Sequence, residues 1–67
     1  MTNQISLPSF EIMLLRWVSE GKTVAEIAMI EGRDRVEIQS VLNQVVSTLG
    51  TRSLLDAIEK AKVNKII

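Results

Sequence analysis

Three glycines divide this chain, and each stands two or three residues before a side chain that commonly begins a helix. The pairs are Gly21 with Thr23, Gly32 with Asp34, and Gly50 with Ser53. Glycine can adopt the left-handed conformation that closes a helix, and Ser, Thr or Asp side chains accept hydrogen bonds from the first amides of the next one. Repeated three times, this pattern predicts four helices joined by short turns.

The predicted helices span residues 8–20, 24–31, 35–49 and 54–63. In the third, apolar residues follow the i, i+3, i+4, i+7 spacing of a buried stripe; they are Ile38, Val41, Leu42, Val45 and Leu49. No segment alternates strictly between apolar and polar residues, as a half-buried strand would. We therefore expect one all-α, four-helix bundle-like domain over residues 1–67, with a central helix-turn-helix.

The turn between the first two predicted helices carries the clearest signal. Gly21 ends one helix, and Thr23 with Glu26 has the Thr-x-x-Glu spacing of a capping box, in which each side chain bonds the backbone amide of the other residue. Only three residues therefore separate the end of the first predicted helix from the start of the second.

Composition restricts the chemistry available to the chain. Its 67 residues include no Cys and no His, which excludes disulfides, thiol nucleophiles, Cys/His zinc sites and a Ser-His-Asp triad. No paired catalytic constellation is visible, so we expect no enzyme activity, no cofactor and no metal site. Apolar runs are too short for a membrane span and the N-terminus lacks a secretory pattern, so a cytoplasmic protein without a membrane partner is expected. Met1 allows a free-standing protein.

Two motifs and a set of scattered residues resemble a known family. The motifs are Gly-Lys-Thr-x-x-Glu-Ile-Ala at residues 21–28 and Leu-Gly-x-Arg at residues 49–52. The scattered residues are Leu7, Leu14, Leu15, Arg16, Trp17, Val18, Glu20, Gly32, Ile38, Leu42 and Ala57. Over about residues 7–62 the chain resembles the LuxR-type helix-turn-helix, the DNA-binding output domain of many bacterial response regulators and quorum-sensing activators. Region 4 of sigma factors has a similar helical plan, but the Gly-Lys-Thr turn suits it less well.

The resemblance implies a transcription regulator, or its output domain, with the third helix in the major groove of double-stranded DNA and the fourth in a dimer interface. The DNA contacts then expected are Lys22, Thr23, Arg33, Arg35, Gln39, Ser40, Asn43 and Arg52. The dimer contacts then expected are Leu55, Glu59 and Lys62. DNA binding of weak to moderate strength and a homodimer are the implied partnerships.

The third predicted helix departs from the family pattern, which usually places Lys or Arg at several of its exposed positions. Residues 36–49 contain neither, and eight basic and eight acidic residues give the whole chain zero net charge. The cations left on the flanks are Lys22, Arg33, Arg35 and Arg52. If all four neutralise phosphates, log K falls with log salt at a slope of about −3.6, from about −0.9 per contact. An isolated copy should therefore bind DNA weakly.

Uncharged side chains on the same helix offer another way to read bases. Gln39 and Asn43 lie four residues apart, on one face, and amides can pair with the edge of adenine through two hydrogen bonds. The alternative for both residues is a solvent-exposed face without DNA contact. For Arg33 and Arg35 the alternative is a solvated turn beside Asp34.

A second interpretation keeps the fold but makes the third helix a protein-binding face, so that the chain is an adaptor or antagonist of another transcription regulator. The zero net charge favours it, as does a surplus of apolar residues for so small a domain; these are Met13, Met29, Ile30, Val36 and Val46. A slightly rearranged core is the other explanation of this surplus.

Several further positions carry expectations of their own. Met13 stands where the family usually has Glu, and Glu31 where it has an apolar residue. Trp17, the sole tryptophan, is expected in the core. The apolar tail, residues 63–67, is expected to pack back on the domain or to meet a partner.

Overall fold

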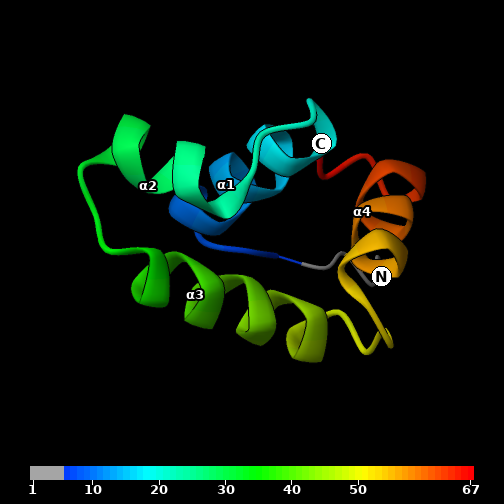
Figure 1. Ribbon diagram of the computed structural model, residues 1–67. Helices are drawn as coiled ribbons and strands as arrows, with labels where there is room; N and C mark the ends of the chain where they lie inside the picture. Colours follow the sequence, from blue (N-terminus) through cyan, green and yellow to red (C-terminus); the bar gives the residue numbers. More distant parts are fainter. Residues whose placement is uncertain (1–5) are drawn as a thin grey trace.

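The computed structural model describes residues 6–67, which form four α-helices and no strand (Figure 1). They are α1 (Ser9–Ser19), α2 (Val24–Glu31), α3 (Arg35–Thr48) and α4 (Leu54–Val63). The all-α, four-helix prediction is confirmed, and each observed helix end lies within one residue of its predicted position. Residues 1–5 of the expected domain, including Met1, lie outside the described residues.

The capping predictions hold at α2 and α4. The amide of Glu26 donates to the Thr23 hydroxyl at 3.1 Å, and the amide of Thr23 donates to Glu26 Oε1 at 2.9 Å, which completes the capping box. At α4, the Ser53 hydroxyl accepts a 3.2 Å bond from the amide of Asp56. Gly32 closes α2 in the left-handed region, with φ of 67°.

At α3 the capping prediction is wrong in its detail. Asp34 is the N-cap residue by backbone conformation, but its side chain accepts no capping hydrogen bond. Glu37, three residues after Asp34, forms a salt bridge with Arg33.

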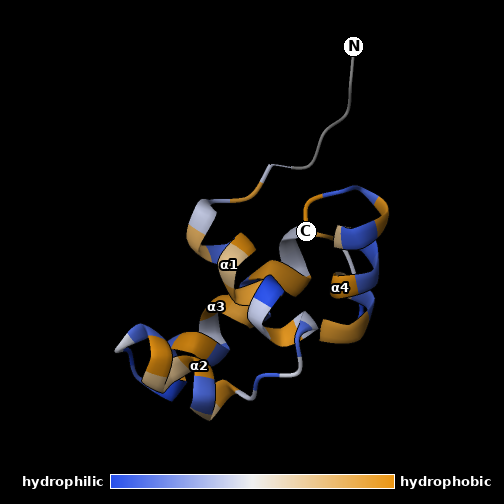
Figure 2. Ribbon diagram, turned by 90° about the horizontal axis from the view of Figure 1, so that it is seen from above, coloured by the Kyte–Doolittle hydropathy of each residue, from blue (hydrophilic) through white to orange (hydrophobic). Residues whose placement is uncertain are grey.

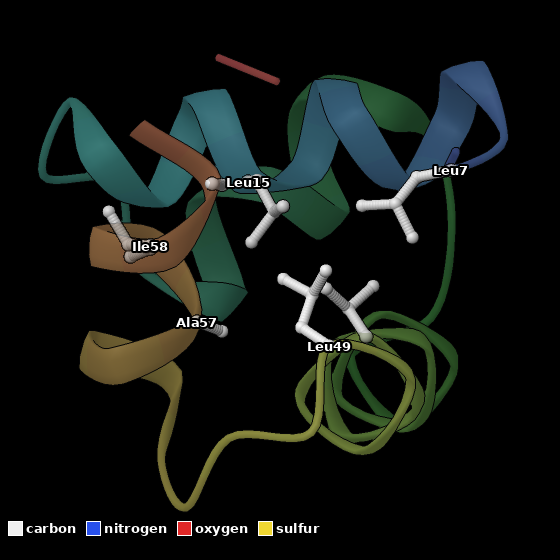
Figure 3. Close-up of a cluster of buried hydrophobic side chains, with 7 residues drawn as sticks. Leu7, Leu15, Leu49, Ala57 and Ile58 are labelled. Carbon is white, nitrogen blue, oxygen red and sulfur yellow. The ribbon is translucent and has the colours of Figure 1, made fainter. Parts of the chain in front are cut away.

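Two apolar clusters hold the helices together. The first joins α1, α3 and α4 (Figure 3) and contains Leu7, Leu15, Val45, Leu49, Ala57, Ile58 and Ala61. The second joins α1, α2 and α3 and contains Leu14, Ile27, Ala28, Ile38 and Leu42. Because α3 contributes its first half to one cluster and its second half to the other, its apolar stripe is buried along most of its length. This fixes which face of α3 is turned outward.

The apolar residues expected in surplus separate into two groups. Met13 and Val46 are half-buried, and Val46 packs against the first cluster. Val36, Met29 and Ile30 remain exposed, at 81%, 78% and 49% of their accessible surface. Burial therefore accounts for only some of these apolar side chains. The exposed ones lie on α2 and at the start of α3; Figure 2 colours the apolar parts of the helices orange.

The tail and Trp17 both contact the core. Ile66 and Ile67 are half-buried against the first cluster, and the amide of Ile66 donates to the carbonyl of Ala61 at 2.7 Å. The expectation that the tail packs back is confirmed for these two residues, whereas Val63 is 77% exposed. Trp17 is half-buried against the second cluster. None of the described helices has both the length and the apolar character needed to cross a lipid bilayer.

Candidate nucleic-acid interface

The outer face of α3 is uncovered and mostly polar. In Figure 1 this helix runs along one side of the molecule, with α1 and α2 on its other side and α4 beyond its C-terminal end. Its exposed polar residues include Gln39, Ser40, Asn43, Gln44 and Ser47. At about 1.5 Å per residue, the 14 residues of α3 extend roughly 21 Å. A helix of this length, packed through one face only, can present the other to a ligand.

A hydrogen bond joins the two amides that sequence reasoning singled out. Gln39 Nε2 donates to Asn43 Oδ1 at 3.0 Å, one turn along the exposed face. This bond holds the two side chains together in the absence of a ligand. It could not be read from the spacing alone, which shows only that the two residues share a face.

The amide pair borders an open groove of about 300 Å³ between α3 and the start of α4, here called the α3–α4 groove. Its lining residues are Gln39, Leu42, Asn43, Val46, Arg52, Ser53 and Leu54. Arg52, which follows α3 in the chain, therefore lines the same groove as the two amides. Ser53 is an addition that sequence reasoning treated only as a helix cap.

A second open groove, the α2–α3 groove, lies at the other end of α3. It has a volume of about 550 Å³ and is lined by Thr23, Val24, Ala25, Arg35, Val36 and Gln39. Gln39 belongs to both grooves and therefore connects them. Five of the eight expected DNA contacts consequently lie along one strip, which we call the α3 strip: Thr23, Arg35, Gln39, Asn43 and Arg52.

The other three expected contacts lie outside the α3 strip. Ser40 is exposed on α3 but lines neither groove, and Lys22 is half-buried in the turn before α2. The guanidinium of Arg33 lies 4.4 Å from the centre of the Phe10 ring and donates to Glu37. With both an aromatic face and a carboxylate as partners, Arg33 is engaged within the protein. No sequence signal placed Phe10 beside it, because the contact joins α1 to the turn after α2.

Electrostatics at the start of α2 also bear on anion binding. The amide of Thr23, then its hydroxyl, and the charge of Lys22 lower the pKa of Glu26 from its ordinary value of 4.5. Glu26 is therefore a carboxylate at neutral pH, placed at the helix N-terminus where a phosphate would otherwise be favoured. Its charge reduces the attraction that Lys22 offers to DNA.

The three residues expected at a dimer interface share one exposed face of α4. Leu55, Glu59 and Lys62 are all exposed, and Leu55 is 77% exposed. Their i, i+4, i+7 spacing places them on one side of the helix, away from the buried residues of the first cluster. By contrast, Lys60 donates to the carbonyl of Leu49 at 2.7 Å and ties α4 to the end of α3.

Among residues 6–67, no cluster of His, Cys, Asp and Glu side chains could hold a metal ion. No protein-family model matches this chain, and a search of curated proteins finds no relative. The chemistry that the α3 strip offers is that of its own side chains. It combines two arginines, a hydroxyl and a coupled pair of amides, which are groups that bind phosphates and the edges of bases.

Proposed function

We propose that this protein binds double-stranded DNA through the exposed face of α3, as a cytoplasmic bacterial transcription regulator or as the output domain of one. The observation that carries the proposal is the α3 strip, in which an amide pair is flanked by exposed arginines near both ends of one uncovered helix. The resemblance to the LuxR-type helix-turn-helix supports the same function.

In the proposed complex the outer face of α3 enters the major groove, which is about 12 Å wide and admits one helix. Arg35 and Arg52 contact phosphates on either side, and Gln39 with Asn43 faces base edges. Contacts to phosphates fix the position of the helix without reading sequence, whereas contacts to base edges confer the sequence preference. The division of roles follows from the positions of the charges, which lie at the flanks, and of the amides, which lie between them.

Affinity in this complex is limited by the small number of available cations. Arg33 is engaged by Glu37 and Phe10, which leaves Lys22, Arg35 and Arg52. Three phosphate contacts give a salt slope of about −2.7 per chain, at about −0.9 per contact. Pairing of two copies through Leu55, Glu59 and Lys62 of α4 would present two α3 helices to one palindromic site. Once the first α3 helix is bound, the second would bind the same DNA as an intramolecular step.

Selection of genomic DNA fragments by the purified chain, at two salt concentrations, tests this proposal. We expect a short palindrome to be enriched at the lower concentration and its recovery to fall at the higher. The double variant Gln39→Ala with Asn43→Ala should lose the enrichment, while Gln44→Ala, an exposed amide on the same helix, should retain it. Failure to retain any fragment at low salt would contradict DNA binding.

A second candidate function is supported by the exposed apolar residues. Val36 is 81% exposed and lies in the α2–α3 groove beside Val24 and Ala25, so a largely apolar surface is open to solvent at one end of α3. Such a surface suits a protein partner, as an adaptor or antagonist of another transcription regulator would require. Recovery of one identified regulator with the wild type and with Gln39→Ala, but not with Val36→Lys, would favour this function over DNA binding.

A further inference from the structure

We infer that the α3 strip reads adenine rather than guanine, with Gln39 as the base-reading residue and Asn43 as the residue that positions it. The inference rests on the proposed DNA binding and deepens it, because it assigns the class of base pair that the site prefers. It starts from the 3.0 Å hydrogen bond between the two amides.

This hydrogen bond determines which groups of Gln39 are left for a ligand. One of its two Nε2 hydrogens is donated to Asn43 Oδ1. The other Nε2 hydrogen and Oε1 remain, so the side chain presents one donor and one acceptor on the same planar amide. Both residues are exposed, and both border the α3–α4 groove, so these groups face solvent and not the core.

One donor beside one acceptor matches adenine and not guanine. In the major groove adenine offers N7 as an acceptor and its N6 amino group as a donor, which pair with the remaining N–H and Oε1 of Gln39. Guanine offers two acceptors, N7 and O6. Against guanine, Oε1 of Gln39 would face O6, and these two acceptors have no hydrogen to share. The second N–H of Gln39 could otherwise donate to O6, but it is already donated to Asn43.

The distribution of cations supports the same preference. Arginine and lysine are the side chains that most often read guanine, and α3 carries only Arg35, at its first position, with neither residue type at positions 36–49. The cation beside the amide pair in the α3–α4 groove is Arg52, which lies in the turn after α3 and not on its outward face. Its place at the end of the helix suits a phosphate contact.

The test selects a preferred duplex from a randomised pool with the full chain and then measures affinity for single changes in that duplex. At one position or more, replacing A·T by G·C should weaken binding roughly 5- to 150-fold. At that position, 7-deazaadenine, which lacks the N7 acceptor, should weaken binding as well. Gln39→Ala should abolish the difference between A·T and G·C there, and Gln39→Arg should reverse it in favour of guanine. Gln44→Ala should leave the preference unchanged.

The role of Asn43 is tested by rescue. Asn43→Ala removes the acceptor that orients Gln39 and should reduce the preference for adenine. Asn43→Asp keeps an acceptor oxygen in the same place and should restore the preference, although its negative charge weakens binding to every sequence. Arg52→Ala should weaken binding to all sequences alike.

Four outcomes would overturn the inference. Enrichment of G·C pairs with no A·T preference at any position, or an adenine preference that survives Gln39→Ala, would remove the assignment while leaving DNA binding intact. Loss of the preference for A·T in Arg52→Ala would show that Arg52, and not Gln39, reads the base. Failure of every duplex to bind would instead overturn the proposed DNA binding and this inference with it.

Discussion

The indole nitrogen of Trp17 donates a 3.0 Å hydrogen bond to Oε2 of Glu31, and this bond joins α1 to the last residue of α2. Both side chains are half-buried. The bond gives Glu31, a charged residue at the end of α2, a structural role. It holds in place the helix that precedes the turn into α3.

Replacing Glu31 by Ala should destabilise the domain by about 1 kcal/mol, because the partly buried indole N–H loses its partner. In a domain of this size that loss lowers the midpoint of thermal unfolding by roughly 4–8 °C. Circular dichroism melting curves measure it, with Glu31→Gln as the control that keeps an acceptor oxygen and most of the stability. Equal losses in the two variants would show that the hydrogen bond does not contribute.

Adjacent residues on α3 should respond very differently to truncation. Ile38 is fully buried in the second cluster, so Ile38→Ala should cost about 2–5 kcal/mol and unfold much of the population of so small a domain. Gln39 is exposed, and Gln39→Ala should change stability by no more than about 0.5 kcal/mol. Urea denaturation of the two variants measures both effects. A large loss in Gln39→Ala would place that residue in the fold and not in a ligand-binding face.

The lowered pKa of Glu26 predicts a loss of stability in acid. A carboxyl whose pKa is lower in the folded chain stabilises it above the unfolded pKa, near 4.5, and this contribution is lost as the pH falls through the folded value. The wild type should therefore melt at a higher temperature than Glu26→Gln at pH 6, and the difference should shrink as the pH falls below 4.5. A difference that is constant between pH 6 and pH 3 would contradict the role of the ionised carboxylate.

The salt dependence of DNA binding should separate two arginines that sequence reasoning treated alike. Arg52→Ala should reduce the magnitude of the slope of log K against log salt by about 1, because one phosphate contact is lost. Arg33→Ala should leave the slope nearly unchanged, because its guanidinium is already paired with Glu37. Titrations of a fluorescent duplex at four or more salt concentrations give both slopes. Equal reductions would mean that Arg33 leaves Glu37 to contact DNA.

The exposed face of α4 should control assembly. Leu55→Lys should convert a dimer to a monomer and weaken binding to a palindromic duplex, with little change in the stability of the fold. Met29→Lys is the matched control, since Met29 is 78% exposed and Leu55 77%, but Met29 lies on α2. Sedimentation velocity measures the change. A wild-type chain that remains monomeric at high concentration would contradict the dimer interface.

The fold was largely predictable because its signals are local. Gly32 and the Thr23–Glu26 capping box act within a few residues, and the buried stripe of α3 follows from spacing on one helix. The parts that escaped prediction are long-range. The stacking of Arg33 on Phe10 and the bond from Trp17 to Glu31 join α1 to residues at the end of α2 or just beyond it, and no local pattern encodes them.

The candidate site was predictable as a set of residue types but not as a surface. Gln39 and Asn43 could be placed on one face from their spacing, whereas their hydrogen bond depends on side-chain conformation. Arg52, in the turn after α3, lines the same groove as these amides, which their separation in the sequence did not show. Local pairing decided which cations remain available, and the sequence alone did not show that Glu37 would bind Arg33.

A titration of the isotope-labelled chain with duplex DNA at low salt, followed by amide and side-chain NMR signals, tests the central claim most directly. The largest shifts should fall on Gln39 and Asn43, with smaller ones at Arg35 and Arg52, while the signals of α1 residues should stay unchanged. Shifts confined to other surfaces, or no shifts at any DNA concentration, would contradict the claim that the exposed face of α3 binds DNA.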